Sequence, residues 1–159
     1  MYISYEEYTA LYGDIAEKTF DRLSFEACRH LDRLTTGVDG VKKLKVAFPS
    51  DEDDAAAVAR CAASVVNILA QIHEAEQSAS LGRGYDSTPN GLQGKVISAV
   101  SAGGESITYS TGGAKTAVDA AISDIAARNR LIASTVRNAL SGICDANGVC
   151  LLYMGAYPR

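Results

Sequence analysis

The chain has 159 residues, 47% of them hydrophobic and 21% charged, with a formal net charge of −4. This composition is typical of a folded globular chain and excludes general disorder. A chain of this length buries about 70% of its unfolded surface, so one core is expected, and the acidic balance gives no overall attraction to nucleic acid or anionic membranes.

The opening residues lack the basic and apolar regions of a secretion signal, since Glu6 and Glu7 follow Met1 closely. Apolar runs are shorter than the roughly 20 residues that a membrane span needs. We therefore expect a protein made in the cytosol, with no membrane partner.

Two helices are predicted in the first third of the chain. Tyrosines three and four positions apart indicate a short amphipathic helix over residues 5–12, which Gly13 ends. From Ala16 to Thr35, apolar residues recur every three or four positions with charged residues between them, which predicts a helix of about five turns. The stretch 41–45 then carries three lysines and is interpreted as a solvated basic connector.

The longest helix is predicted to run from about residue 51 to Ser78, with Ser50 as its cap. The four acids at its start complement the positive end of the helix dipole. Consecutive carboxylates in one turn point in different directions, so a metal site is not expected there. The apolar stripe that follows is broad and rich in alanine, which favours a central place in a helical bundle.

The middle of the chain has the pattern of a loop followed by a β-hairpin. Glycine, serine and asparagine are frequent from Leu81 to Gly94, which predicts a mobile loop. Two β-rich runs from Val96 to Ser110 flank Gly103 and Gly104, a strong hairpin signal. In the simplest register Ser98 lies opposite Tyr109, and one face collects Val96, Val100, Ile107 and Tyr109.

A last helix is predicted from about Thr116 to Leu140, followed by an extended tail from Gly142 to Arg159. The tail is apolar at Leu151, Leu152, Tyr153 and Met154. An apolar terminal segment implies docking on its own core or on a partner. The fold class is therefore mainly α: a single domain over residues 1–159, with a bundle of three to four helices, a β-hairpin inserted before the last helix and an extended carboxyl-terminal tail.

Residues with catalytic chemistry are few. The four cysteines form no CxxC pair and are expected to be free thiols, with Cys28 and Cys61 in the core. His30 and His73 lie inside predicted helices and are interpreted as packing or boundary residues. No phosphate-loop or zinc spacing occurs. We expect no enzymatic activity, no cofactor and no metal.

The order of elements carries a resemblance. The tyrosine-rich helix ending in Tyr12-Gly13, the Phe20-Asp21-Arg22-Leu23 helix, the long alanine-rich helix, the hairpin and the final Leu151–Gly155 segment resemble the head–tail connector (adaptor, or head-completion) proteins of long-tailed phages. The resemblance implies a homo-oligomeric ring, typically dodecameric, in the virion neck. Its implied partners are the portal protein, a tail-side neck or terminator protein, and DNA that passes through the channel without sequence-specific binding.

By this analogy, the interface candidates are the hairpin and the tail, at Val96, Val100, Ile107, Tyr109, Leu151, Leu152, Tyr153 and Met154. The implied location is the virion, assembled in the bacterial host cytoplasm. Two alternatives stay open. One is a small helical DNA-binding or DNA-packaging accessory protein that uses Lys42, Lys43 and Lys45. The other is an enzyme that uses Cys144 or His73.

Overall fold

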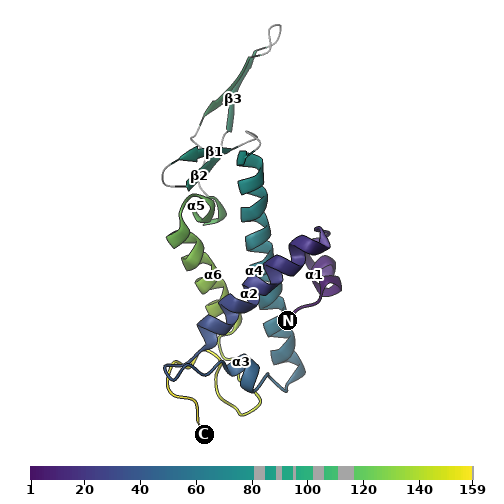
Figure 1. The fold of residues 1–159 in the computed structure, drawn as a ribbon, viewed down its shortest axis with the longest axis vertical. Helices are drawn as coiled ribbons and strands as arrows, with labels where there is room; N and C mark the ends of the chain where they lie inside the picture. Colours follow the sequence, from purple (N-terminus) through teal and green to yellow (C-terminus); the bar gives the residue numbers. More distant parts are fainter. Residues whose placement is uncertain (81–84, 89–90, 95, 102–105, 111–116, 159) are drawn as a thin grey trace. The chain divides into compact units, whose positions relative to one another are not determined.

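The computed structural model describes the backbone except at residues 81–84, 89–90, 95, 102–105, 111–116 and 159, and the side chains of residues 1–77, 117–118, 120–122 and 124–158 (Figure 1). The described elements are α1 (Tyr5–Tyr12), α2 (Glu17–Thr35), α3 (Lys43–Val46), α4 (Glu52–Ser80), β1 (Tyr85–Thr88), β2 (Gly91–Gly94), β3 (Val96–Ser101), β4 (Ser106–Ser110), α5 (Ala117–Ser123) and α6 (Ile125–Ala139). The mainly helical class is thereby confirmed.

The chain forms two compact units. The first comprises Met1–Leu69 and Ile132–Arg159, and the second comprises Ala70–Leu131. The prediction of a single domain over residues 1–159 stays a prediction.

Helix α1 lies where its periodicity predicts, and α2 begins at Glu17, one residue after the predicted start, and ends at Thr35 as predicted. Ser4 begins α1 with a capping box, in which its hydroxyl and the Glu7 carboxylate each accept a backbone N–H, and Gly13 ends it at φ 87°. The aromatic face of α1 packs on α2, since the Tyr8 ring centroid lies 5.5 Å from that of Phe20. The apolar stripe of α2 is buried at Phe20, Leu23, Ala27 and Leu31.

Helix α4 begins at Glu52, one residue after the start that a cap at Ser50 would give. Oδ1 of Asp51 accepts the N–H groups of Asp53 and Asp54, each at 3.1 Å, so Asp51 rather than Ser50 is the cap. The prediction of Ser50 was wrong because an aspartate directly after it offers the same acceptor. The buried stripe of α4 in the first unit contains Val58, Cys61, Ala62, Val65, Val66 and Leu69.

Over Glu52–Gln77, α4 is long and apolar enough to cross a membrane by length and composition alone, with 44% of the tested window buried. The core helix of a globular protein has the same property, because its apolar stripe faces its own chain. The expectation of no membrane partner therefore stays a prediction.

The last helix is divided, where one helix from Thr116 to Leu140 was predicted. Asp124 separates α5 from α6, and its carboxylate accepts the N–H of Ala126 at 2.8 Å and of Ala127 at 3.2 Å. This is the geometry of a helix cap, so a new helix starts at Ile125. The single-helix prediction was wrong because it followed the apolar stripe alone and gave Asp124 no role as a cap.

In the second unit, an ion pair joins Arg128 to Glu76 at 2.9 Å. Strands β1 and β2 pair antiparallel within the stretch predicted as a mobile loop, and residues 81–84 and 89–90 of that stretch lie outside the described residues.

Strands β3 and β4 also pair antiparallel, but with a register shift between Ile97 and Ala99. Ile97 therefore lies opposite Tyr109, where Ser98 was predicted, and Val96 lies opposite Ser110. The shared face predicted for Val96 and Tyr109 was wrong, because a bulge adds one residue to β3 and changes the alternation beyond it. The predicted Gly103–Gly104 turn lies outside the described residues, so the hairpin as a whole stays a prediction.

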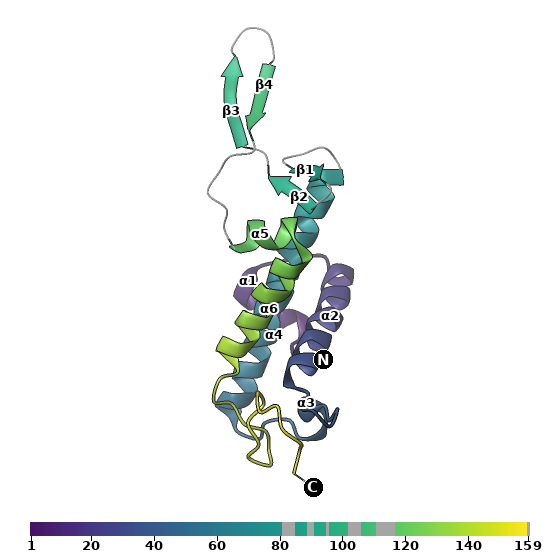
Figure 2. The same ribbon diagram turned by 90° about the vertical axis from the view of Figure 1, so that its left-hand side faces the viewer.

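The carboxyl-terminal segment lies at the same end of the first unit as α3 (Figure 2). After Gly142 the chain reverses direction, and Cys144 and Cys150 form an isolated antiparallel bridge. Two backbone bonds close the reversal, from Asp145 N to Val149 O and from Leu151 N to Ile143 O, both at 2.9 Å. The region expected to be an extended tail thus contains a tight turn.

Candidate functional site

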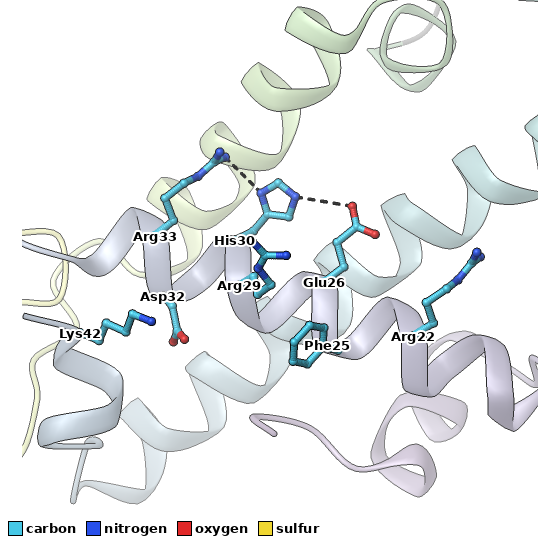
Figure 3. A pocket seen from close by; sticks show the side chains of 8 residues that line it. All are labelled: Arg22, Phe25, Glu26, Arg29, His30, Asp32, Arg33 and Lys42. Carbon is cyan, nitrogen blue, oxygen red and sulfur yellow. Dashed lines mark hydrogen bonds and ion pairs between the residues drawn. The ribbon is translucent and has the colours of Figure 1, made fainter. Parts of the chain in front are cut away.

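A hollow of about 600 Å³ lies along α2 in the first unit and is the first candidate site (Figure 3). We call it the basic groove. It is lined by Arg22, Phe25, Glu26, Arg29, His30, Asp32, Arg33 and Lys42. Four of these eight side chains are cations at neutral pH and two are carboxylates.

The helical repeat of α2 explains why these side chains share one surface. Arg22, Glu26, Arg29 and Arg33 are three or four residues apart and therefore lie on one face. The opposite face holds the buried stripe that begins at Phe20, so burial of that stripe leaves the charged face in solvent. The side chains of Arg22, Arg29, Arg33 and Lys42 are all exposed.

His30 sits half-buried in the groove between two charged neighbours. Arg33 Nη2 lies 3.2 Å from His30 Nδ1, and Glu26 Oε1 lies 3.9 Å from its Nε2. Burial lowers the pKa of His30, and Arg33 lowers it further, against an opposing effect of Glu26. The imidazole is therefore neutral at pH 7, and it accepts the arginine N–H at Nδ1 while its own N–H faces Glu26.

The carboxylates of the groove only partly offset its cations. The Asp32 carboxylate interacts with residues outside the groove: Tyr2 donates its hydroxyl to Oδ1 at 2.5 Å, and the Lys45 ammonium lies 3.2 Å from Oδ2. Within the residues that the structure describes, Arg22, Arg29 and Lys42 form no ion pair. Guanidinium forks of this kind bind phosphate or carboxylate groups.

The second candidate site is a cluster that we call the carboxyl-terminal clasp. The Lys43 ammonium donates to the carbonyl oxygens of Cys150 at 3.3 Å, Leu151 at 3.1 Å and Tyr153. Lys43 is 0% exposed. Burial lowers its pKa, opposed by the negative charges of Asp145 and Asp39.

The burial of Lys43 corrects the prediction of a solvated connector over 41–45. Residues 43–46 form α3, and this turn buries Lys43 and Leu44 together while Lys42 and Lys45 stay exposed. Three backbone carbonyls from the far end of the chain supply acceptors for the amine, which makes its burial tolerable. Lys43 is closed off from solvent and therefore is not available to a phosphate group in this structure, while the DNA-binding alternative as a whole stays a prediction.

Two aspartates complete the clasp. Oδ2 of Asp39 accepts the Tyr157 N–H at 2.6 Å, and this bond is the main reason why the pKa of Asp39 is lowered. Buried Asp145 accepts the N–H groups of Asn147 and Val149 at 2.9 Å each and the Tyr157 hydroxyl at 2.6 Å. Together with Lys43, these bonds hold the segment in a defined conformation.

The clasp places the four predicted tail residues in different environments. Leu151 is fully buried in its own unit, Leu152 is half-buried, and Tyr153 and Met154 are 52% and 55% exposed. Val38, which no sequence pattern singled out, is 78% exposed and donates its N–H to the Met154 carbonyl at 3.0 Å. The backbone bond thus brings Val38 beside Met154, and we call the three exposed residues Val38, Tyr153 and Met154 the apolar cluster.

The other predicted interface residues belong to β3 and β4, and the side chains of Val96, Val100, Ile107 and Tyr109 lie outside the described residues. Among the described side chains, no group of three or more His, Cys, Asp and Glu residues is arranged to hold a metal ion. Sequence reasoning missed the basic groove, although the spacing of Arg22, Arg29 and Arg33 contains the signal.

No protein-family model, curated protein or solved structure matches this chain. A function can therefore be argued only from its residues and their geometry.

Proposed function

We propose that the protein is a structural virion subunit of a head-to-tail connector (adaptor) ring of a long-tailed phage, joining portal to tail and forming part of the DNA channel. The observation that carries this proposal is the exposed cluster of Val38, Tyr153 and Met154, which the clasp holds in place. Exposed apolar side chains on an ordered segment favour a protein–protein contact. The order of elements along the chain supports the same assignment.

A second exposed apolar pair lies near the other end of α2. Leu11 and Tyr12, at the end of α1, are exposed and precede α2 closely, whereas Val38 follows it closely. A helix of 19 residues is about 28 Å long, so the two apolar spots lie near opposite ends of a long element. A ring with head-to-tail contacts requires two different surfaces on each subunit, and these two spots fit that requirement.

The proposed ring is homo-oligomeric, with the portal protein and a tail-side neck or terminator protein as its neighbours. The hairpin at Val96–Ser110 is proposed as a further contact with a neighbour, since an isolated two-stranded ribbon is marginal in water. DNA would pass through the channel without sequence-specific binding. No catalytic role, cofactor or metal belongs to this proposal.

The experiment is to determine the oligomeric state by sedimentation velocity and negative-stain imaging, with and without the portal protein. We expect ring particles, and we expect the double variant Val38→Asp with Met154→Asp to stay smaller at unchanged thermal stability. The matched control is Val46→Asp, because Val46 is similarly exposed but lies outside both apolar spots. A protein that stays monomeric with its portal, or variants that assemble normally, would contradict the proposal.

The basic groove favours a second candidate function, a small helical DNA-binding or packaging accessory protein. Four phosphate contacts from Arg22, Arg29, Arg33 and Lys42 predict a slope of log K against log salt of about −3.6 on duplex DNA. Replacing Arg29 and Arg33 by Ala should reduce that slope by about 2. The control replaces Arg60 and Arg137, which are exposed outside the groove. Absence of binding at low salt would exclude this function.

A further inference from the structure

The two cysteines of the carboxyl-terminal reversal lie side by side. Cys144 and Cys150 form an isolated antiparallel bridge, and their Sγ atoms are 3.2 Å apart. Both are free thiols, Cys144 half-buried and Cys150 exposed. Their spacing of six in the sequence matches no redox motif, so this proximity arises from the fold.

The backbone around the pair has the geometry that a disulfide requires. The flanking bonds run from Asp145 N to Val149 O and from Leu151 N to Ile143 O, so Cys144 and Cys150 are a non-hydrogen-bonded pair of the ladder. Such pairs place their Cα atoms about 4.5 Å apart, inside the range that disulfides span. The two sulfurs need to move only about 1 Å closer to bond.

The reversal is anchored independently of the thiols. Asp145 accepts the N–H groups of Asn147 and Val149, and Gly148 takes the positive φ of 75° that the turn needs. The Cys144 N–H lies 3.4 Å from the Asp54 carboxylate at the start of α4. Both cysteine backbones are therefore held in place before any bond forms.

We propose that Cys144 and Cys150 are a redox modification site, which a small-molecule disulfide such as oxidised glutathione converts into an intramolecular disulfide. The proposal is independent of the ring function. The bond would close the turn directly before the carbonyls of Cys150 and Leu151 that accept from Lys43. Oxidation would thus fasten the clasp by a covalent bond.

The reaction has two exchange steps. The exposed Cys150, as thiolate, attacks one sulfur of oxidised glutathione, and one glutathione leaves as thiolate. The hydrogen bond with Cys150 raises the pKa of Cys144, which therefore keeps its proton in the first step. Cys144 then loses its proton to solvent and attacks Cys150 Sγ, and the second glutathione leaves. Two protein S–H bonds become one S–S bond, and the two electrons and two protons reduce one oxidised glutathione to two thiols.

The other two cysteines provide an internal reference. Cys61 is buried, and its pKa is raised to about 12, so it exchanges slowly. Cys28 is half-buried on α2. Neither is paired with a second sulfur among the described residues, so each should remain a thiol or, at Cys28, a mixed disulfide.

The test exposes the full-length protein to oxidised glutathione at pH 8 and identifies the products by peptide mass spectrometry. One tryptic peptide, beginning at Asn138, contains both Cys144 and Cys150. We expect this peptide to lose two hydrogen atoms with no cross-link between chains, and the thermal midpoint to rise by about 5 °C. Reduction should reverse both changes.

The matched variants are Cys150→Ser, which should lose the bond and the rise in midpoint, and Cys28→Ser, which should keep both. A persistent glutathione adduct on Cys150, a disulfide between two chains, or unreacted thiols after Cys28 has reacted would each overturn the proposal. A bond that forms without raising the midpoint would overturn its role in fastening the clasp.

Discussion

The basic groove and the carboxyl-terminal clasp use the same residue type in opposite ways. Lys42 lines the groove and is exposed, whereas Lys43, the next residue, is fully buried under backbone carbonyls. The cationic side chains of the groove stay hydrated and can bind an anion from solution. In the clasp, the Lys43 ammonium donates to carbonyl oxygens of its own chain and is not available to bind an anion. The helical turn of α3, rather than charge, therefore decides which of the two lysines is buried.

The largest effect that this comparison predicts is on Lys43. Lys43→Met keeps most of the side-chain length but removes the donor to three carbonyls, and we expect a loss of about 3 kcal/mol in the free energy of unfolding. Lys42→Met should change it by less than about 0.5 kcal/mol. Urea denaturation measures both, and equal effects of the two variants would remove the distinction between groove and clasp.

Asp145 should have the next largest effect. Asp145→Ala leaves two N–H groups and the Tyr157 hydroxyl without their acceptor, and we expect a loss of about 2 kcal/mol. Tyr157→Phe removes only one of these bonds and should cost about 1 kcal/mol. If Tyr157→Phe were as damaging as Asp145→Ala, the turn bonds of Asp145 would contribute nothing.

A smaller effect is predicted in the groove, as a function of pH. The folded-state pKa of His30 is lowered, so the unfolded chain binds a proton first as pH falls. The contribution of His30 to the free energy of unfolding should therefore be constant above the ordinary histidine pKa of about 6.5 and decrease as pH falls from there to the folded-state value. In urea titrations at pH 5 to 8, the free energy of unfolding of His30→Gln should change less with pH over that range than that of the unchanged protein. A steeper profile for the variant would contradict the sign.

The smallest effect on stability is expected at Arg29. Its exposed side chain forms no ion pair within the described residues, so Arg29→Ala should change the free energy of unfolding by less than about 0.5 kcal/mol. The same variant should weaken the binding of heparin, a polyanion, measured by the salt concentration that elutes the protein. Unchanged elution would show that the groove does not act as an anion site.

Local patterns predicted the helices whose ends carry their own signals. Ser4 and Gly13 bound α1 through contacts within three or four residues, and the stripe of α2 repeats every turn. Asp51 and Asp124 show the limit of this reasoning. Either of the adjacent residues Ser50 and Asp51 can cap a helix, so the sequence does not decide between them. An aspartate inside a continuous helical pattern, such as Asp124, cannot be told from an ordinary surface charge.

The candidate sites were less predictable because they join distant parts of the chain. The acceptors of Lys43 lie 107 to 110 residues away, so a basic run suggested only solvent exposure. The proximity of Cys144 and Cys150 depends on the turn between them, which periodicity does not report. The groove could have been predicted from the sequence, since Arg22, Arg29 and Arg33 share one helical face.

The sequence distance between Lys43 and its acceptors also sets the order of folding. Closing a loop of more than 100 residues carries a large entropic cost before any contact compensates it, so the clasp should form after the local helices. During synthesis, the acceptors emerge long after Lys43 has left the ribosome. Val38 and Met154 become neighbours only at that last step, so a truncated or unfinished chain would lack the complete apolar cluster.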